Sequence, residues 1–420
     1  MTLEQRSNTA SDPSRIPYWI YTDPEVYRRE QERIFGGPVW SYVGLEAEIP
    51  NPGDFRRTHV GDRSVILVRD KEGGVQVLVN RCSHRGVELC RRSAGTVTRF
   101  MCPYHQWVFD LQGNLCGVPF RRGVHGKGGM PADFAPSDHP IERLRVATHN
   151  GVVFASFAKD PEPLESFLEG PTRAYFERVF DGRALRVLGY SQQRVSCNWK
   201  LIVENTKDPY HATLLHAFLV TFGLFRADQQ SEVKLDPRGR HASLISRHGR
   251  QEASAATSEM ASYRGGYVLH DRRLIEGVHE FGDQTGVVLQ TLFPNLIIQQ
   301  QMNTLATRRI VPRAPDATDL VWTFFGYGDD DEAMLARRLR QANLMGPAGL
   351  VSLDDGEVLR AAQEGIRGAS ASAVVEMGGR DWQDADYMVT ETAIRGFFHH
   401  YAELMGLSRG RTGEPGEEAR

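Results

Sequence analysis

The sequence predicts an α+β protein in which a small all-β unit, residues 40–157, is inserted into a larger mixed domain made of residues 1–39 and 158–420. Residues 40–157 contain short apolar runs separated by turn residues, which is typical of strands joined by hairpins. After residue 158, helical patterns surround a run of strands between 287 and 327, which favours an antiparallel sheet flanked by helices.

The first expected element is a helix from Pro24 to Phe35. Asp23 is a suitable N-cap, Pro24 fits the first helical position, and Gly36-Gly37 ends the helix. In the all-β unit, strands are expected at 64–68 and 75–79, at 107–109 with the stretch after 114, and at 151–154.

In the mixed domain, helices are expected around 164–179, 204–218, 331–344, 352–366 and 390–404. Residues 226–285 are polar and rich in Gly, Arg and Ser, so they are expected to form an active-site loop region. The tail 408–420 is expected to be disordered.

Composition excludes several classes of protein. The chain has 50 basic and 53 acidic residues, so a formal net charge of -3 argues against nucleic acid as a partner. No apolar run approaches the roughly 20 residues needed to span a bilayer, and the N-terminus lacks a secretory signal. Five cysteines are too few for a disulfide scaffold, which indicates a cytoplasmic protein in which clustered cysteines bind metal.

The first such cluster is Cys82-Ser83-His84, followed after 17 residues by Cys102-Pro103-Tyr104-His105. Each end offers one thiolate and one imidazole, whereas zinc sites usually pair two cysteines in one knuckle. A [2Fe–2S] cluster with two His on one iron and two Cys on the other requires this mixture. A structural zinc site is the alternative.

With Arg85-Gly86 after the first His and with Tyr104 and Trp107 around the second, this pattern resembles the Rieske proteins. The resemblance implies that Cys82, His84, Cys102 and His105 bind a Rieske [2Fe–2S] cluster. Cys90, Cys116 and Cys197 do not fit the motif and are expected to be buried thiols.

A second constellation follows the apolar run 199–203. Asp208 and His211 are three residues apart and therefore share a helical face. His211 and His216 are five apart, which turns them about 140° from each other on a straight helix. They converge on one ion only if the helix is broken or bulged there. Two His with a distant carboxylate would form an open-sided iron(II) site that activates O2.

This segment resembles the D-x2-H-x4-H motif of Rieske non-heme iron ring-hydroxylating oxygenase large subunits. The resemblance implies a helix-grip catalytic domain, with His211 and His216 as ligands of a mononuclear Fe(II). It also implies that Asp208 bridges to His105 of another copy in a homotrimer, and that Asn205 is an amide near the iron. The alternative for Asp208 is a charge partner at a helix N-terminus.

The family segment that supplies the carboxylate resembles Gly346-Pro347-Ala348-Gly349 and the residues after it. By its offset from this stretch, Asp355 is the expected iron ligand, and Asp354 is the second choice. The alternative is that both acids merely lie near a helix start, where negative charge is favoured.

The resemblance extends over nearly the whole chain and is closest to large subunits of the salicylate 5-hydroxylase, anthranilate dioxygenase and terephthalate dioxygenase group. It implies that Arg308 and Arg395 hold a substrate carboxylate, which guanidinium grips by two parallel hydrogen bonds. Surface or ion-paired arginine is the alternative in a chain rich in arginine. Candidate apolar walls of the active site are Leu214, Val220, Phe222, Leu296 and Leu350.

The resemblance therefore implies an aromatic-ring-hydroxylating mono- or dioxygenase that uses O2 and electrons from NADH. No dinucleotide fingerprint is present, so the electrons would arrive through a separate reductase and, in some systems, a ferredoxin. Small beta subunits would complete an α3β3 assembly in many relatives. Three alternatives remain open: an oxygenase acting on a non-aromatic substrate such as a quaternary amine, a non-catalytic electron carrier, and a zinc-scaffold interaction protein.

Overall fold

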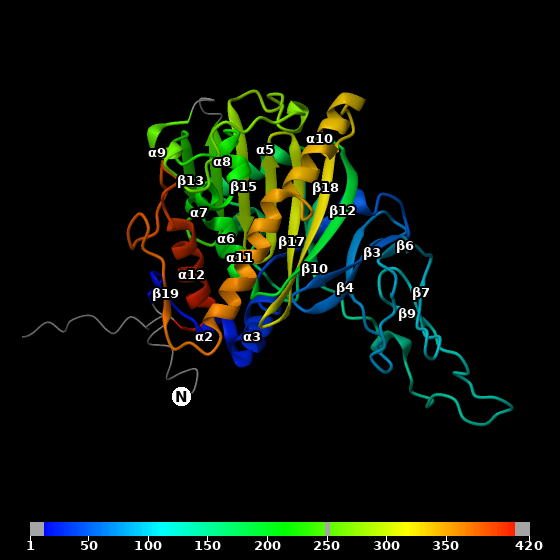
Figure 1. Ribbon diagram of the computed structural model, residues 1–420. Coiled ribbons are helices and arrows are strands. Elements are labelled where there is room, and N and C mark those ends of the chain that lie inside the picture. Colours follow the sequence, from blue (N-terminus) through cyan, green and yellow to red (C-terminus); the bar gives the residue numbers. More distant parts are fainter. Residues whose placement is uncertain (1–11, 248–252, 408–420) are drawn as a thin grey trace, which may run out of the picture.

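The computed structural model describes residues 12–247 and 253–407 (Figure 1). The expected disordered tail, 408–420, lies outside the described residues. Most of the described chain forms a broad antiparallel sheet covered by helices, and a group of smaller sheets projects from one side of it. This arrangement is the α+β architecture that the sequence predicts.

The N-terminal elements attach the start of the chain to the mixed domain. They are β1 (Arg15–Pro17), α2 (Trp19–Thr22), α3 (Pro24–Glu30) and a π-helical turn, η2 (Gln31–Phe35). Asp23 caps α3 by accepting a hydrogen bond from the N–H of Glu25, and Pro24 is its first residue, as the sequence predicts. β1 pairs antiparallel with β19 (Ser372–Val374), far along the chain.

Small antiparallel sheets make up the projecting unit. One has the order β5-β4-β3-β6 and another the order β7-β8-β9. A third, β10-β11-β2, joins the first and last strands of the unit. The strands are β2 (Ser41–Leu45), β3 (Asp54–Val60), β4 (Arg63–Arg69), β5 (Val75–Val79), β6 (Ala94–Thr96), β7 (Phe100–Met101), β8 (Val108–Phe109), β9 (Leu115–Gly117), β10 (Arg145–His149) and β11 (Val152–Ser156); short 3-10 turns are η3 (Glu46–Glu48) and η4 (Pro136–Asp138). The expected hairpins correspond to β4–β5 and β8–β9.

The broad sheet has seven antiparallel strands in the order β12-β18-β17-β16-β15-β14-β13. These are β12 (Leu185–Val195), β13 (Ser231–Leu235), β14 (Ala242–Arg247), β15 (Thr285–Leu292), β16 (Leu296–Gln301), β17 (Thr304–Ala314) and β18 (Ala317–Tyr327). Side chains alternate between its faces, so Leu296 and Ile298 pack into a different cluster from Ile297.

The structure corrects one sequence-based expectation here. Residues 226–285 are not a single loop region, because β13 and β14 lie inside that range and pair into the sheet. The polar residues Ser231, Ser243 and Ser246 in these strands are buried. β12, an eleven-residue strand that pairs along β18, was also not expected.

Helices cover the sheet. They are α4 (Leu164–Phe167), α5 (Pro171–Val179), α6 (Trp199–Lys207), α7 (Pro209–Leu215), α8 (Ala217–Thr221), α9 (Ala255–Ser258), α10 (Glu332–Met345), α11 (Leu350–Ile366) and α12 (Thr392–Met405), with a 3-10 turn η5 (Arg272–Leu274). Figure 1 shows α11 crossing in front of the sheet with α12 beside it, and both contact α6. The core under these helices includes Ile297, Ala306 and Trp322.

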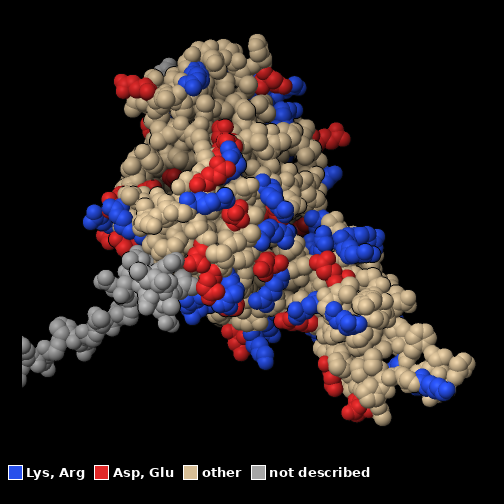
Figure 2. Space-filling view, turned by 60° about the horizontal axis from the view of Figure 1, so that its bottom comes forward, with Lys and Arg blue, Asp and Glu red and all other residues tan. Residues whose placement is uncertain are grey.

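Two surface properties of the described residues bear on function. None of their helices is both long and apolar enough to cross a bilayer. Figure 2 shows acidic and basic side chains interspersed over much of one face of the molecule, in keeping with the small net charge of -3.

Candidate metal centres

A break in the helical segment 199–221 positions the two histidines. The chain leaves helical geometry at Asp208 and again at His216, so that α6, α7 and α8 are separate helices. The Asp208 carboxylate caps α7 by accepting hydrogen bonds from the N–H groups of Tyr210 and His211. Because the helix ends before His216, the two imidazoles can turn toward each other, which is the condition that their spacing imposed.

The three predicted ligand residues come together at this break. One ligand atom from each of His211, His216 and Asp355 lies within 4.8 Å of the others. Asp355 Oδ1 is 3.4 Å from His211 Nε2 and 3.3 Å from His216 Nε2. Asp355 projects from the second turn of α11, which contacts α6 and α8. Two imidazoles and one carboxylate on a single point match the donor set of an open-sided iron(II) site.

Outer carboxylates contact the far nitrogen of each imidazole. Asp208 Oδ2 lies 3.3 Å from His211 Nδ1, and Asp354 Oδ2 lies 3.4 Å from His216 Nδ1. Such contacts fix the tautomer and orientation of a ligating imidazole. The geometry thus separates the two neighbouring acids: Asp355 faces both Nε2 atoms, whereas Asp354 contacts His216 from outside.

Asn205, on α6, completes the surroundings of the three side chains. Its Nδ2 donates a hydrogen bond to Asp355 Oδ1 at 3.1 Å and lies 3.2 Å from His211 Nε2. The amide therefore orients the carboxylate, as expected for a residue next to the metal position.

The electrostatics of the site favour a positive charge. Burial would lower the pKa of His211, but the neighbouring carboxylates of Asp208 and Asp355 raise it to about 10. Burial would raise the pKa of Asp355, but contacts with His211 and His216 hold it well below its usual range. A site that retains a proton this strongly is also suited to a metal cation, so the residues present fit an iron ion.

A small cavity of about 70 Å3 adjoins the three side chains. Its apolar walls come from the sheet and from the helices around the break: Leu219, Phe225, Leu244, Val287, Leu289 and Val351. The wall residues expected from sequence are therefore wrong. Leu296 packs into the core on another face of the sheet, Leu214 and Leu350 are largely exposed, and Val220 and Phe222 do not line the cavity.

Arg308, which the sequence predicts to bind a substrate carboxylate, lines this cavity. It lies on β17 and shares a sheet face with Ala306 and Ile310, because strand side chains alternate. Its guanidinium lies 4.1 Å from the ring centre of Trp322 and donates hydrogen bonds to Gln299 Oε1. Burial lowers the pKa of Arg308 to about 10, and Asp355 partly offsets this effect. No described carboxylate forms an ion pair with this buried cation.

Arg395, in contrast, does not reach the cavity. Its guanidinium donates hydrogen bonds to the backbone carbonyls of Asp381, Val375 and Met377. These bonds hold the segment before α12 against that helix. The expectation that Arg395 binds the substrate is therefore wrong, and Arg395 instead stabilises the local fold.

Asp208 also faces outward. It lines both the cavity and a wider groove of about 600 Å3, together with His211. Glu204 and Glu391 line the same groove, and burial raises the pKa of Glu204 to about 8. Asp208 thus stands between the cavity and the surface, in addition to capping α7.

The four predicted cluster residues lie on two loops of matching conformation. In each loop the cysteine N–H donates to the carbonyl five residues later, Val87 or Trp107. The residue four positions after each cysteine, Gly86 or Gln106, has a positive φ and donates to the cysteine carbonyl. The two loops therefore present their cysteines in the same way, whereas the histidine comes two residues after Cys82 and three residues after Cys102.

The loops bring like residues together. The side chains of Cys82 and Cys102 are buried and lie close enough that Cys102 helps to raise the pKa of Cys82, after burial itself. The rings of His84 and His105 are 4.6 Å apart, nearer the surface, and His84 stacks on Trp107. His105 Nδ1 is buried and has no hydrogen-bond partner among the described residues. A thiol pair, an imidazole pair and an orphaned ring nitrogen fit a [2Fe–2S] cluster with mixed ligation.

The remaining cysteines differ from this set. Cys90 and Cys197 are buried thiols, as expected, and burial raises their pKa values to about 11 and about 12. Cys116 is exposed, contrary to expectation.

Sequence reasoning missed the glutamines that support Arg308. Gln299 accepts from the Arg308 guanidinium and donates to Gln301, which lines the cavity. Alternation from the apolar Ile297 would have placed both glutamines on the Ile297 face of the strand. The sequence around Gln299 and Gln301 on β16, however, does not reveal that they lie beside Arg308 on β17.

Two family descriptions match the chain. Residues 39–126 match the Rieske [2Fe-2S] domain, and residues 180–407 match the ring hydroxylating alpha subunit (catalytic domain). The chain is 52% identical over 402 residues to the large oxygenase component of salicylate 5-hydroxylase from Ralstonia sp., covering 94% of this chain and 95% of that one. It is 44% identical to the anthranilate 1,2-dioxygenase large subunit of Burkholderia cepacia (94% of each chain) and 41% identical to a terephthalate 1,2-dioxygenase alpha subunit of Comamonas sp. (94% and 96%).

Solved structures share the fold. Naphthalene 1,2-dioxygenase from Rhodococcus sp. bound to indole superposes with a TM-score of 0.81 at 24% identity, covering 96% of this chain and 98% of that one. A quaternary ammonium Rieske monooxygenase superposes with a TM-score of 0.73 at 18% identity, covering 95% and 98%. The chain belongs to the family of ring-hydroxylating oxygenase alpha subunits, enzymes whose cofactors are a Rieske [2Fe–2S] cluster and a mononuclear iron.

Proposed function

We propose that the chain is the terminal oxygenase subunit that hydroxylates a single-ring aromatic carboxylate of the salicylate, anthranilate, benzoate or terephthalate type. The observation that carries this proposal is Arg308, a buried guanidinium that forms no ion pair with any carboxylate in residues 12–247 and 253–407. It lies on the wall of the cavity beside His211, His216 and Asp355. An anionic substrate would supply the missing charge through paired hydrogen bonds. The names of the similar large subunits, which act on salicylate, anthranilate and terephthalate, support the same class.

The lining of the site suits an aromatic carboxylate. Apolar side chains on the cavity wall suit a ring, and Arg308 on the same wall suits a carboxylate. Gln299 holds the Arg308 guanidinium in place, and Trp322 supports its face, so the cation need not reorganise when the carboxylate arrives. A cationic quaternary amine would meet repulsion from Arg308, which argues against the non-aromatic alternative.

We assign the cofactor ligands in the same proposal. Cys82, Cys102, His84 and His105 would hold the cluster, and His211, His216 and Asp355 would hold the iron. When bound, these groups supply single electrons and the capacity to activate O2. Asn205 orients the Asp355 carboxylate, and the Asp208 carboxylate, 3.3 Å from His211 Nδ1, would orient that imidazole.

Assembly follows from the position of Asp208. We propose that Asp208, at the groove, also accepts a hydrogen bond from His105 of a neighbouring copy, so that the working unit is a homotrimer, with or without small beta subunits. An NADH-dependent reductase, with or without a ferredoxin, would supply the electrons.

The pairing of β2 with β11 supports residues 40–157 as one unit, and five cysteines free of disulfides support a cytoplasmic location.

Anaerobic titration and product analysis test the substrate assignment. The iron-loaded enzyme is titrated with salicylate, anthranilate, benzoate and terephthalate, and the products of one turnover are identified after O2 is added. Arg308→Gln should weaken binding of the preferred acid by about 10- to 100-fold, because a charged hydrogen-bonded pair is lost.

Arg313→Gln, on the same strand but paired with Asp319 near the surface, is the matched control and should bind normally. Binding of the carboxylates that is equally tight in wild type and Arg308→Gln would contradict the proposal. Formation of no hydroxylated ring product from any of the four acids would contradict it as well.

A further inference from the structure

Positive charge gathers around the cluster loops. Residues 81–105 contain five arginines, Arg81, Arg85, Arg91, Arg92 and Arg99, but only one acid, Glu88. This balance is opposite in sign to the net charge of the chain, which is -3. Arg81 pairs with Glu142 at 3.2 Å, whereas the other four form no ion pair with a described residue. Unpaired guanidinium groups at this density create a local positive potential.

Three of these arginines border a groove of about 460 Å3 in the all-β unit. Phe55 and Phe100 form an apolar floor, with their rings edge to face at 6.0 Å. Met101 and Pro103, the neighbours of Cys102 on either side, form one wall, and the Met101 side chain is 57% exposed. An apolar floor with a charged rim is the usual anatomy of a protein docking surface.

The rim is held in a fixed position. The buried side chain of Asn80 accepts hydrogen bonds from the N–H groups of Leu89 and Cys90 and donates one to the Cys90 carbonyl at 2.8 Å. These bonds tie the turn before Arg91 and Arg92 to the end of β5, from which the first cluster loop begins. A preformed surface of this kind binds without a large ordering cost.

We propose that this groove is the docking site for an acidic electron-donor protein. The Arg91, Arg92 and Arg99 guanidinium groups attract its acidic face, and Phe100 and Met101 contact its apolar centre. The partner is oxidised by one electron, which enters beside the Cys102 ligand, and the cluster is reduced by one electron. The inference rests on the proposed function, because an oxygenase whose sequence carries no dinucleotide fingerprint is expected to need an external donor.

The groove is suited to a donor rather than to a second copy of the chain. Its lining includes neither His84 nor His105, so a partner docked there leaves both imidazole edges free for a neighbouring subunit. If residues 81–105 of a second copy docked there, their arginines would face the arginine rim of the groove, and like charges would repel.

The test measures docking and electron entry separately from turnover. The probe is a reduced, strongly acidic plant-type [2Fe–2S] ferredoxin, whose low potential makes transfer to a Rieske cluster favourable. The variant is Arg92→Glu/Arg99→Glu in the loaded enzyme. The association rate should fall at least about tenfold at low salt, and the difference should shrink as salt is added. The rate of cluster reduction, followed by visible absorbance, should fall in parallel.

Arg122→Glu/Lys127→Glu is the matched control, because it makes the same charge change at two exposed residues of the same unit outside the groove. It should retain the wild-type association rate. An equal loss in both double variants, or no loss in either, would overturn the proposal. A change of oligomeric state in Arg92→Glu/Arg99→Glu alone would make the groove a contact between copies and would overturn it too.

Single turnover with dithionite-reduced enzyme separates this inference from the proposed function. Wild type and both double variants should then hydroxylate equally, because dithionite bypasses the groove. Failure of wild type in this assay would count against the proposed function and would leave the docking measurements to be judged by themselves.

Discussion

At the residue scale, two adjacent acids of α11 face different parts of the same site. Asp355 meets both Nε2 atoms, whereas Asp354 touches only the outer nitrogen of His216. Asp355→Ala should therefore lose the mononuclear iron and keep the visible spectrum of the cluster. Asp354→Asn should keep the iron with roughly 10- to 100-fold weaker affinity, the usual cost of losing such an outer partner. Iron content and absorbance of the two purified variants decide this.

Two outcomes for these variants would contradict the assignment of Asp355 and Asp354. If Asp355→Ala lost the cluster chromophore together with the iron, the two centres would not be structurally independent. If Asp354→Asn lost the iron and Asp355→Ala retained it, the assignments of the two acids would have to be exchanged.

Lys207, the last residue of α6, gives a pH dependence of stability. Burial lowers its pKa to about 7, although Asp236 partly opposes the shift. In the unfolded chain the same group keeps its proton up to a pH of about 10.4. The cost of burying the charged ammonium therefore destabilises the native state in full below pH 7. This destabilisation decreases as the pH rises from about 7 to about 10.4. Lys207→Met should thus raise the melting temperature most near pH 6, and the gain should shrink toward pH 10.

Lys234→Met is the comparison for this prediction, since Lys234 is only partly buried and pairs with Asp384 at 3.2 Å, which raises its pKa. Thermal unfolding followed by circular dichroism at several pH values measures both variants. A gain from Lys207→Met that is constant from pH 6 to 10 would show that the native ammonium does not titrate in this range.

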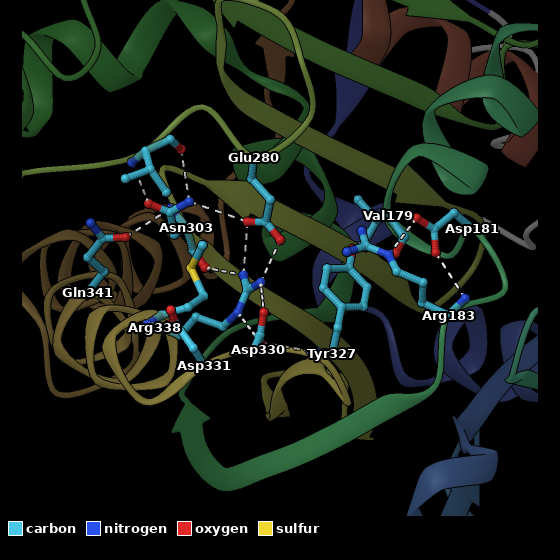
Figure 3. A network of polar contacts seen from close by, with 12 residues as sticks. Val179, Asp181, Arg183, Glu280, Asn303, Tyr327, Asp330, Asp331, Arg338 and Gln341 are labelled. Carbon is cyan, nitrogen blue, oxygen red and sulfur yellow. Dashed lines mark hydrogen bonds and ion pairs between the residues drawn. The ribbon is translucent and has the colours of Figure 1, made fainter.

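At the scale of elements, a buried arginine ties α10 to the sheet (Figure 3). Arg338 bridges Asp330, just after β18, and Glu280, in the segment before β15, and it donates to the carbonyl of Asn303. Removing this charge would take away the ion-pair partner of two buried carboxylates, which would keep only hydrogen bonds from Asn303 and from the N–H of Tyr327. Arg338→Met should lower the free energy of unfolding by about 3–5 kcal/mol.

Urea denaturation measures this effect, and Arg337→Met, next to Arg338 but outside the network, should change stability by well under 1 kcal/mol. Ile275, in the same segment as Glu280, packs against a hydrophobic cluster whose members Leu219 and Val287 also line the cavity. Substrate binding should therefore weaken in Arg338→Met. Unchanged stability in Arg338→Met would mean that the network contributes nothing net.

The elements also show where sequence reasoning works. The five-residue spacing of His211 and His216 required a broken helix, and the chain breaks at His216. That deduction needed only helix geometry. The strands β13 and β14 escaped prediction because their buried serines resemble loop composition, and burial depends on strands that are distant in sequence. The role of Arg395 was misassigned for the same reason, since its acceptors are carbonyls of a segment whose path the sequence does not reveal.

At the scale of the whole molecule, the two metal centres lie far apart within one chain. Figure 1 shows β7 and β9, which adjoin the cluster loops, at the right of the view, and α7, which carries His211, on the left of the sheet. Direct electron transfer is steeply disfavoured over such a span, whereas Asp208 lines a groove at the surface that the loops of a neighbouring copy would have to enter. This separation is the physical reason to expect a trimer in which each cluster serves the next subunit.

Mixed trimers test this expectation. Cys102→Ser removes a cluster ligand and Asp355→Ala removes an iron ligand, so each variant alone should be inactive. Co-expression with two different tags and tandem purification isolates trimers that contain both subunits. In a cyclic trimer, any such mixture has one interface at which an intact cluster faces an intact iron site, so activity should recover to about one third of wild type.

The same trimers distinguish transfer between subunits from transfer within one. If each cluster served the iron of its own chain, every subunit in the mixture would lack one of the two centres, and activity would stay at zero. Asp208→Asn introduced into the Asp355→Ala subunit should leave the recovered activity unchanged, because that subunit only donates electrons. Introduced into the Cys102→Ser subunit, it should abolish the activity, because there Asp208 stands between the neighbour's cluster and the working iron site.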